Sequence, residues 1–173
     1  MKKESILFVC TGNVCRSPMA EYMFCHRING HAGFEVGSAG IAAIPGMEAS
    51  RTAIEVMREW NIDISPHRSR QVQQYHMETF ARVIVMTPLH EQQLALNFPE
   101  FKDKISVLTC YDRNGARNGI ADPIGMSKRT YRDIRNQIWD AIEGLTAYLS
   151  GKDPENTDKG SDEDSYWIGP WRS

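Results

Sequence analysis

Four short runs that favour extended backbone divide the chain and predict its strands. They cover residues 5–10, 34–38, 82–86 and 105–108. The first run contains Ile6-Leu7-Phe8-Val9 without polar residues at alternate positions, which is typical of a strand buried on both faces.

Helix-forming segments lie between these runs and carry clear start signals. Ser17-Pro18 and Thr87-Pro88 each combine a capping residue with a proline suited to the first helical turn, and Ser127 can cap the last helix. The predicted helices cover residues 17–28, 50–60, 69–80, 87–97 and 127–149. In the last of them, apolar residues recur every three or four positions, at Tyr131, Ile134, Ile138, Ile142, Leu145 and Leu149.

The alternation of strands and helices predicts a single α/β domain, with a four-stranded parallel sheet and helices on both faces. Ligands of such sheets bind at the carboxyl ends of the strands, so the segment after the first strand is the first candidate site. Residues 111–126 contain several glycines and form a long predicted loop, which is typical of a functional or mobile segment.

Length and charge exclude several classes of protein. The chain has 173 residues, of which 41% are hydrophobic and 24% charged, and its formal net charge is −2. This length corresponds to one domain. The longest early apolar run is too short for a membrane span or a signal-peptide core. A near-neutral chain without a basic run is also not expected to bind nucleic acid.

The last part of the chain differs in composition from the rest. Residues 151–173 carry six acidic and three basic side chains, and residues 151–165 contain no large apolar residue. We therefore expect a domain over 1–150 and a flexible acidic tail over 151–173. The aromatic end of this tail is expected either to pack on the domain or to contact a partner.

The cysteines indicate a reducing compartment. They stand at positions 10, 15, 25 and 110, and no export signal precedes them. We expect reduced thiols in a cytoplasmic, monomeric protein, with structural roles for Cys25 and Cys110.

The loop after the first strand has the composition of a phosphoryl-transfer site. It reads Cys10-Thr11-Gly12-Asn13-Val14-Cys15-Arg16-Ser17. A loop that curls its N–H groups inward at a helix start forms an anion cradle, and Gly12 and Asn13 tolerate the left-handed backbone that this curl needs. Arg16 can grip two phosphate oxygens. The same field favours the thiolate of Cys10, to which Ser17 can donate a hydrogen bond.

Two other interpretations of this loop explain it less well. Cys10 and Cys15 could bind a metal, but Cys25-His26 lies on a predicted helix without the usual ligand spacing. A nucleotide-binding P-loop needs a lysine in its signature, and none follows Gly12 there.

Four ordered motifs resemble the low-molecular-weight protein tyrosine phosphatases. They are residues 9–21, Ser38-Ala39-Gly40, residues 65–71 and Asp122-Pro123. The resemblance covers about residues 4–150 in matching order and leaves out the tail.

This resemblance implies roles for particular residues. Cys10 would attack phosphorus, Arg16 would bind the phosphoryl oxygens, and Asp122 would act as general acid and then as general base. Ser38 and His67 would hold the loop in shape together with Asn13. Cys15 would either form a protective disulfide with Cys10 or simply pack. The other residues expected around the phosphoryl group are Thr11, Gly12, Val14 and Ser17. No metal or organic cofactor is implied, and the partners would be phosphorylated proteins.

The sequence leaves two possibilities for the phosphorylated residue that the enzyme would act on. Ile124 follows the Asp-Pro pair and Ile44 lies in a loop without aromatics, whereas tyrosine-directed relatives carry aromatic residues at these places. Met86-Thr87 and His90 resemble a bacterial branch that acts on phosphoarginine in proteins. That branch has threonine at the position of Val14, where tyrosine-directed relatives carry an apolar branched residue. We expect phosphotyrosine as substrate, with phosphoarginine as the alternative.

Two further classes share features of this loop. Arsenate reductases have the same fold and loop but relay a disulfide through two more cysteines, and Cys25 and Cys110 are far apart in sequence. A phosphoprotein-binding module without catalysis would require a misplaced acid, and the chain has Cys10, Arg16 and Asp122 together.

Overall fold

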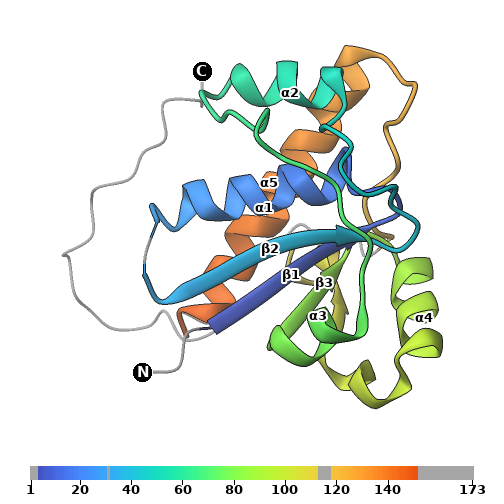
Figure 1. Ribbon diagram of the computed structural model, residues 1–173. Coiled ribbons are helices and arrows are strands. Elements are labelled where there is room, and N and C mark those ends of the chain that lie inside the picture. Colours follow the sequence, from blue (N-terminus) through green and yellow to red (C-terminus); the bar gives the residue numbers. More distant parts are fainter. Residues whose placement is uncertain (1–3, 31, 113–117, 152–173) are drawn as a thin grey trace, which may run out of the picture.

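The computed structural model contains the predicted four-stranded parallel sheet (Figure 1). Residues 4–30, 32–112 and 118–151 are described. The strand order is β2-β1-β3-β4, and every neighbouring pair is parallel. The strands are β1 (Glu4–Cys10), β2 (Phe34–Gly40), β3 (Arg82–Val85) and β4 (Ile105–Val107).

Helices cover both faces of this sheet, as the alternation predicts (Figure 1). The α-helices are α1 (Arg16–Arg27), α2 (Arg51–Arg58), α3 (Gln74–Thr79), α4 (Pro88–Asn97) and α5 (Lys128–Leu149). Helices α1, α2 and α5 pack on the face to which Ile6 and Phe8 of β1 point. Helices α3 and α4 pack on the other face, with Leu7 and Val9. Residues Ile6 to Val9 are fully buried, which confirms the interpretation of the first apolar run.

The register of the central strands sets the place of the candidate loop. Cys10, the last residue of β1, lies opposite Gly40, the last residue of β2. A side chain at Gly40 would come within 2.5 Å of the Thr11 carbonyl oxygen and 2.9 Å of the Asn13 nitrogen. Only a glycine therefore lets the end of β2 approach the loop this closely.

The predicted helix over 69–80 is shorter than expected. Only Gln74–Thr79 is helical, because the preceding residues are extended and bonded to other segments. The backbone N–H of Ser69 donates to Met47, and that of Val72 donates to Gly40. These contacts between distant segments replace the first turns of the predicted helix.

The start of the first helix is also corrected. Helix α1 begins at Arg16 with Cys15 as its N-cap, so Ser17 is not the capping residue. The Ser17 hydroxyl instead lies 3.0 Å from the Cys10 sulfur, inside the buried base of the loop. Two 3₁₀ helices, Pro99–Lys104 and Leu108–Tyr111, had no sequence prediction.

The other two predicted caps are confirmed. Thr87 Oγ1 accepts a hydrogen bond from the N–H of His90 at the start of α4, and Ser127 Oγ accepts one from Thr130 at the start of α5. The apolar positions of α5 from Tyr131 to Leu145 are buried, while Leu149 is only partly covered. The predicted tail, residues 151–173, lies outside the described residues apart from Gly151. No helix in the described part of the chain has the length and hydropathy needed to cross a membrane.

Candidate active site

The loop between β1 and α1 is held from its outer side through its carbonyl groups. The carbonyl oxygens of Cys10 and Thr11 accept hydrogen bonds from Ile41 and Ala42, at 2.9 Å each. The Val14 carbonyl accepts from the Ser50 N–H at 2.7 Å. In contrast, the N–H groups of residues 11–15 donate to no acceptor among the described residues. Such free donors at a helix N-terminus form a cradle for an anion.

Asn13 supports the curl of this loop. Its backbone is left-handed, with φ of 55°, and its side chain is fully buried. Asn13 Nδ2 donates to the hydroxyls of Ser17 and Ser38, at 2.9 Å each. Its Oδ1 accepts from the Arg70 N–H at 2.9 Å. The side chain of Asn13 therefore ties the loop to α1, to β2 and to the segment before α3.

His67 and Ser38 reach the loop through Asn13, as the resemblance implies. His67 Nε2 lies 2.7 Å from the Asn13 carbonyl oxygen, and burial lowers the pKa of this imidazole. The Ser38 hydroxyl accepts from Asn13 and donates to Glu21, a partly buried carboxylate whose pKa is raised by desolvation. Glu21 lies one helical turn after Ser17 on α1, and its part in the network had no sequence prediction.

Cys10 lies at the base of the cradle with a hydrogen-bond donor beside its sulfur. The side chain is almost fully buried, and Sγ is 3.0 Å from Ser17 Oγ. Asn13 already donates to Ser17, so the proton of the Ser17 hydroxyl remains available for the sulfur. The alternative acceptor for this proton, the Ala39 carbonyl, is farther away at 3.4 Å. The arrangement therefore favours a hydrogen bond from the Ser17 hydroxyl to the Cys10 sulfur.

Cys15 has partners of its own. Its Sγ lies 3.3 Å from both the Ser50 hydroxyl and the Tyr131 hydroxyl. Burial raises the pKa of the Cys15 thiol, and it raises the pKa of Tyr131 to about 12. Both groups are thus protonated at neutral pH and share a buried hydrogen-bond cluster with Ser50. The disulfide between Cys15 and Cys10 remains a prediction, because both thiols are free here.

Arg16 is the buried cation of the loop, and its guanidinium is fixed by three groups. Nη1 donates to the Ile120 carbonyl at 3.0 Å, and Nη2 donates to Thr11 Oγ1 at 3.4 Å. Nη2 also pairs with Asp122 Oδ2 at 3.0 Å, where the Arg16 side chain is 4% exposed and that of Asp122 is 43% exposed. Nε is buried and has no hydrogen-bond partner among the described residues. A buried guanidinium N–H without an acceptor is suited to bind an oxyanion.

The loop before α5 brings Asp122 to this place. The Ile120 N–H donates to the Met86 carbonyl at 2.6 Å, at the end of β3. The Ile124 N–H donates to Asp122 Oδ1 at 3.2 Å. The structure therefore brings Asp122, which is distant in sequence, to the loop that carries Cys10 and Arg16 at the carboxyl ends of the strands.

His90 makes a contact with the loop that had no sequence prediction. His90 lies in the first turn of α4, and its Nε2 is 2.9 Å from Thr11 Oγ1. Burial, assisted by the charge of Arg16, lowers the pKa of His90 to about 4, so the imidazole is neutral at physiological pH. The Thr87-Pro88 helix start could have pointed to this residue, since it places His90 in the first turn of a helix that follows a strand.

The predicted specificity residues Ile44 and Ile124 are both exposed, at 70% and 56%. Further large apolar side chains are exposed in the same connecting segments, namely Met47 and Met126. Val14 is half-buried in the loop itself. The side chains offered here to a substrate are thus aliphatic or thioether groups.

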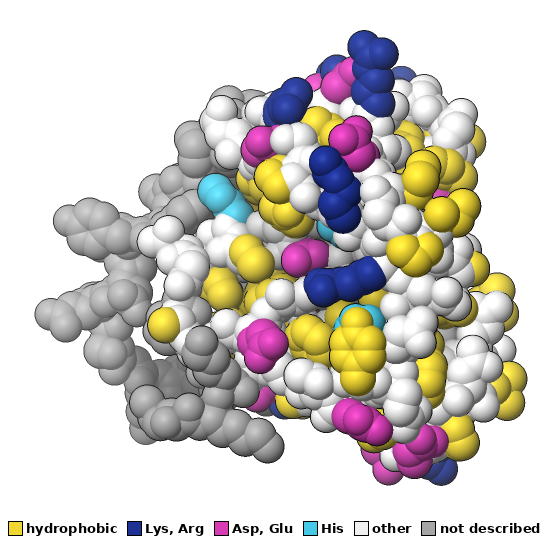
Figure 2. Space-filling view, in the orientation of Figure 1, with side chains coloured by type: hydrophobic (Ala, Val, Ile, Leu, Met, Phe, Trp, Pro, Cys, Tyr) yellow, Lys and Arg dark blue, Asp and Glu magenta, His cyan; other side chains and the backbone are white. Residues whose placement is uncertain are grey.

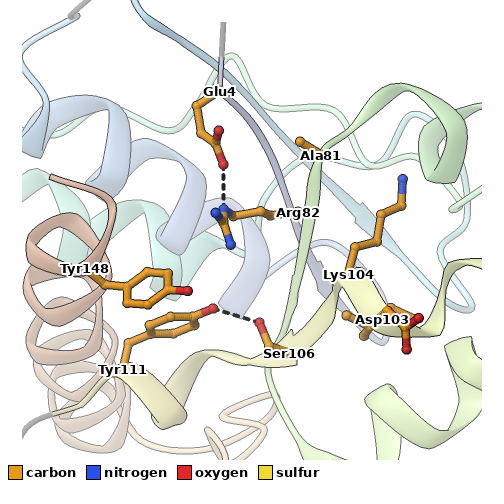
Figure 3. Close-up of a pocket in the computed structure, with 9 residues that line it drawn as sticks. Glu4, Ala81, Arg82, Asp103, Lys104, Ser106, Tyr111 and Tyr148 are labelled. Atoms are coloured by element: carbon orange, nitrogen blue, oxygen red, sulfur yellow. Dashed lines mark hydrogen bonds and ion pairs between the residues drawn. The ribbon is translucent and has the colours of Figure 1, made fainter. Parts of the chain in front are cut away.

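A separate pocket lies at the amino ends of the strands, opposite the end of the sheet that carries the candidate loop (Figure 3). It has a volume of about 400 Å³ and is lined by residues at the amino ends of β1, β3 and β4. In it, Arg82 pairs with Glu4, and the Tyr111 hydroxyl lies 3.0 Å from Ser106 Oγ. Its described lining contains no cysteine or histidine, so the candidate chemistry belongs to the loop after β1.

Comparisons with known proteins agree with this geometry. The model of the low molecular weight phosphotyrosine protein phosphatase family matches residues 5–155. A protein-arginine-phosphatase from Geobacillus stearothermophilus is 40% identical over 144 residues, which are 83% of this chain and 95% of the relative. The low molecular weight protein-tyrosine-phosphatase Wzb from Escherichia coli K12 is 32% identical over 130 residues, or 75% of this chain and 84% of the relative. Among solved structures, the YwlE arginine phosphatase from Geobacillus stearothermophilus matches with a TM-score of 0.79 and 36% identity, covering 91% of this chain and 99% of that one.

Proposed function

The chain belongs to the low molecular weight phosphotyrosine protein phosphatase family, and on that premise we propose that it hydrolyses phosphotyrosine in proteins through a phosphocysteine on Cys10. The observation that carries the proposal is the buried guanidinium of Arg16. Its Nε has no acceptor among the described residues, and its Nη2 is held by the carboxyl group that the reaction needs as its acid.

Substrate binding rearranges the contacts of Arg16. Nε–H and one Nη2–H point from the same edge of the planar guanidinium and can bind two phosphoryl oxygens together. Nη2 pairs with Asp122 in the free enzyme, so the arriving phosphoryl group takes the place of this carboxylate. The displaced Asp122 is half-exposed and is thereby released towards the leaving oxygen.

In the first chemical step, the Cys10 thiolate attacks phosphorus. After Asp122 leaves Arg16, its carboxylate takes up a proton from solvent. An S–P bond then forms, the bond between phosphorus and the tyrosine oxygen breaks, and the protonated Asp122 gives its proton to that oxygen. The N–H groups of residues 11–15 and the guanidinium of Arg16 stabilise the charge on the equatorial oxygens.

In the second step, water releases the phosphoryl group. The Asp122 carboxylate takes a proton from the attacking water, an O–P bond forms and the S–P bond breaks. The products are inorganic phosphate and the Cys10 thiolate, which Ser17 stabilises by donating a hydrogen bond over 3.0 Å. The sequence of steps needs neither a metal nor a cofactor.

The choice of phosphotyrosine rests on the apolar surroundings of the loop. Val14 is half-buried in the loop, and Ile44 and Ile124 are exposed in the neighbouring segments. These side chains can pack on an aromatic ring but offer no acceptor for a guanidinium group.

Phosphoarginine is the second candidate, and a specific observation favours it. The arginine phosphatase relative is 40% identical to this chain, whereas the tyrosine phosphatase relative is 32% identical. The half-exposed carboxylate of Asp122 can also pair with a guanidinium group.

The experiment that tests the proposal compares kcat/KM for matched phosphotyrosine and phosphoarginine peptides in metal-free buffer, with the Cys10→Ser variant as the control. We expect a preference for phosphotyrosine and no turnover by the variant. A preference for phosphoarginine would assign the chain to the second candidate. Turnover by Cys10→Ser would contradict the phosphocysteine itself.

The enzyme is further proposed to act as a cytoplasmic monomer on phosphorylated proteins. Its four thiols are free, and Cys25 and Cys110 are exposed, which suits a reducing compartment. Acidic and basic side chains are interspersed on the face shown in Figure 2, without a continuous basic surface of the kind that nucleic acids select.

A further inference from the structure

We infer that His90 is a positioning residue for phosphoryl binding: its ring fixes the hydroxyl of Thr11, and this hydroxyl aligns the guanidinium of Arg16 and is left free to donate to the phosphoryl group. This inference rests on the proposed function, and it adds a role for a histidine outside the loop.

The contacts of the three side chains form a short chain of hydrogen bonds. His90 Nε2 lies 2.9 Å from Thr11 Oγ1, and Thr11 Oγ1 lies 3.4 Å from Arg16 Nη2. His90 and Arg16 are buried, whereas Thr11 is exposed. The hydroxyl therefore stands at the open side of the cradle, with a buried support behind it.

His90 is itself held in place. Its backbone N–H donates to Thr87 Oγ1 in the capping interaction of α4, at 3.2 Å. The neighbouring Met86 carbonyl accepts from Ile120, whose own carbonyl accepts from Arg16 Nη1. The connection from β3 to α4 thus supports the guanidinium on two sides: through Ile120 on Nη1, and through His90 and Thr11 on Nη2.

The protons in this chain can be assigned by counting donors and acceptors. A guanidinium has no acceptor, so Arg16 must donate to Thr11 Oγ1. If His90 carried its proton on Nδ1, that buried N–H would have no acceptor among the described residues. Buried donors without a partner are rare in proteins. We therefore place the proton on Nε2, which donates to Thr11.

This assignment gives Thr11 a defined task. Its oxygen accepts from both His90 and Arg16, which uses both lone pairs, and its own proton remains unused. That proton can be donated to a phosphoryl oxygen bound at Arg16. A neutral His90 suits this role, because a charged imidazole would repel the guanidinium.

The first test measures the binding of inorganic phosphate by calorimetry, which does not depend on turnover. We expect His90→Leu to weaken phosphate binding about tenfold, which corresponds to about 1.4 kcal/mol. His90→Gln retains an amide N–H that can donate to Thr11, and we expect it to stay within about twofold of the unmodified enzyme. Equal losses in the two variants, or no loss in His90→Leu, would contradict the inference.

His76 provides the matched control. It is also a buried histidine with a pKa lowered by burial, and its Nε2 has no partner among the described residues. Its Nδ1 accepts from the backbone N–H of Gln73, the N-cap of α3, and not from the loop after β1. We expect His76→Leu to lower the thermal midpoint as His90→Leu does, but to leave phosphate affinity unchanged. If both variants weakened phosphate binding alike, the effect of His90 would be general loss of structure.

A double-mutant cycle with Thr11→Val tests whether His90 acts through the hydroxyl. In the Thr11→Val background, we expect His90→Leu to have no further effect on phosphate affinity. Additive losses would mean that His90 acts by another route.

Imidazole ¹⁵N chemical shifts give an independent measure of the proton position. We expect His90 to carry its proton on Nε2, and a proton on Nδ1 would overturn the donor assignment. Absence of phosphate binding in the unmodified enzyme would contradict the proposed function itself, which is a different outcome from binding that ignores His90.

Discussion

Asp122 and Arg16 form an ion pair across the mouth of the site, with 3.0 Å between Oδ2 and Nη2. In the reaction proposed above, Asp122 is the general acid and Arg16 binds the phosphoryl oxygens of the substrate. We therefore expect a bound phosphoryl group to compete with the Asp122 carboxylate for Arg16 Nη2, so that substrate binding releases Asp122.

Replacing Asp122 by alanine separates these two effects. We expect kcat for a phosphotyrosine peptide to fall by about 10²–10⁴, because the leaving oxygen loses its proton donor. A substrate with an acidic leaving group should lose much less, since it departs without a proton. The affinity for inorganic phosphate should rise, because the competing carboxylate is gone. Calorimetry and steady-state kinetics check the three results. Equal kinetic losses on both substrates would exclude Asp122 as the proton donor.

Replacing Cys10 by serine should abolish turnover and leave the fold intact. The hydroxyl is a far weaker nucleophile than a thiolate, while the carbonyl contacts that shape the loop come from the backbone and do not involve the sulfur. We expect an unchanged circular dichroism spectrum and retained phosphate binding in calorimetry. Loss of phosphate binding would show that the sulfur also shapes the cradle.

Replacing Val14 by threonine tests what determines the preference for phosphotyrosine over phosphoarginine. Threonine has nearly the shape of valine and adds a hydroxyl that can accept from a guanidinium. We expect kcat/KM for a phosphoarginine peptide to rise by about tenfold relative to a phosphotyrosine peptide, as one additional hydrogen bond would give. Val14→Ala is the control, since it opens space without adding an acceptor. A similar shift in Val14→Ala would indicate that space, and not the hydroxyl, decides specificity.

Replacing Asn13 should separate side-chain bonds from backbone strain. Asn13→Gly removes hydrogen bonds to Ser17, Ser38 and Arg70, and we expect a loss of about 2–4 kcal/mol in the free energy of unfolding. Asn13→Ala should cost about 1 kcal/mol more, because alanine disfavours the left-handed backbone at φ of 55°. Urea denaturation of both variants measures the difference. Equal stability of the two variants would mean that the loop relaxes to another backbone conformation.

Stability should fall as the pH drops below about 6.5, the ordinary pKa of histidine. Burial lowers the pKa values of His67, His76 and His90, the last to about 4. Between these values and about 6.5, the unfolded chain binds protons that the folded chain does not, so protonation favours unfolding. Burial raises the pKa of Glu21, so the folded chain binds a proton there more readily than the unfolded chain does. This group therefore favours folding as the pH falls towards the ordinary pKa of glutamate. Urea denaturation between about pH 7.5 and pH 5 measures the slope. His76→Gln should reduce this slope. A free energy of unfolding that does not change with pH would contradict the lowered pKa values of the three histidines.

The parallel sheet, the order of the helices and the position of the candidate loop could be predicted from the sequence. Local signals determine these features: the run around Ile6 to Val9 is fully buried, and Thr87 and Ser127 cap helices as predicted. For Ser17, the expected contact with Cys10 is present at 3.0 Å, but the expected helix cap is wrong, because Cys15 is the N-cap and the Ser17 hydroxyl also accepts from Asn13 inside the fold.

Contacts between distant segments account for the other differences. Residues 69–73 have a helical pattern, but bonds to Met47, Gly40 and Asn13 hold them extended. The pair of Thr11 and His90 joins residues 79 positions apart, so no local pattern could reveal it. The ion pair of Arg16 and Asp122 likewise depends on how the loop before α5 returns to the end of β3.

The outward hydrogen bonds of the loop carbonyls have a consequence for ligand choice. Since Ile41, Ala42 and Ser50 already hold the backbone in its curled shape, a bound oxyanion does not have to order the loop, and little conformational entropy is lost on binding. A preformed cradle of this kind accepts any tetrahedral oxyanion of suitable size and charge, including the phosphate that the reaction releases. We therefore expect inorganic phosphate to inhibit the reaction, and we expect discrimination between phosphorylated side chains to come from residues around the cradle.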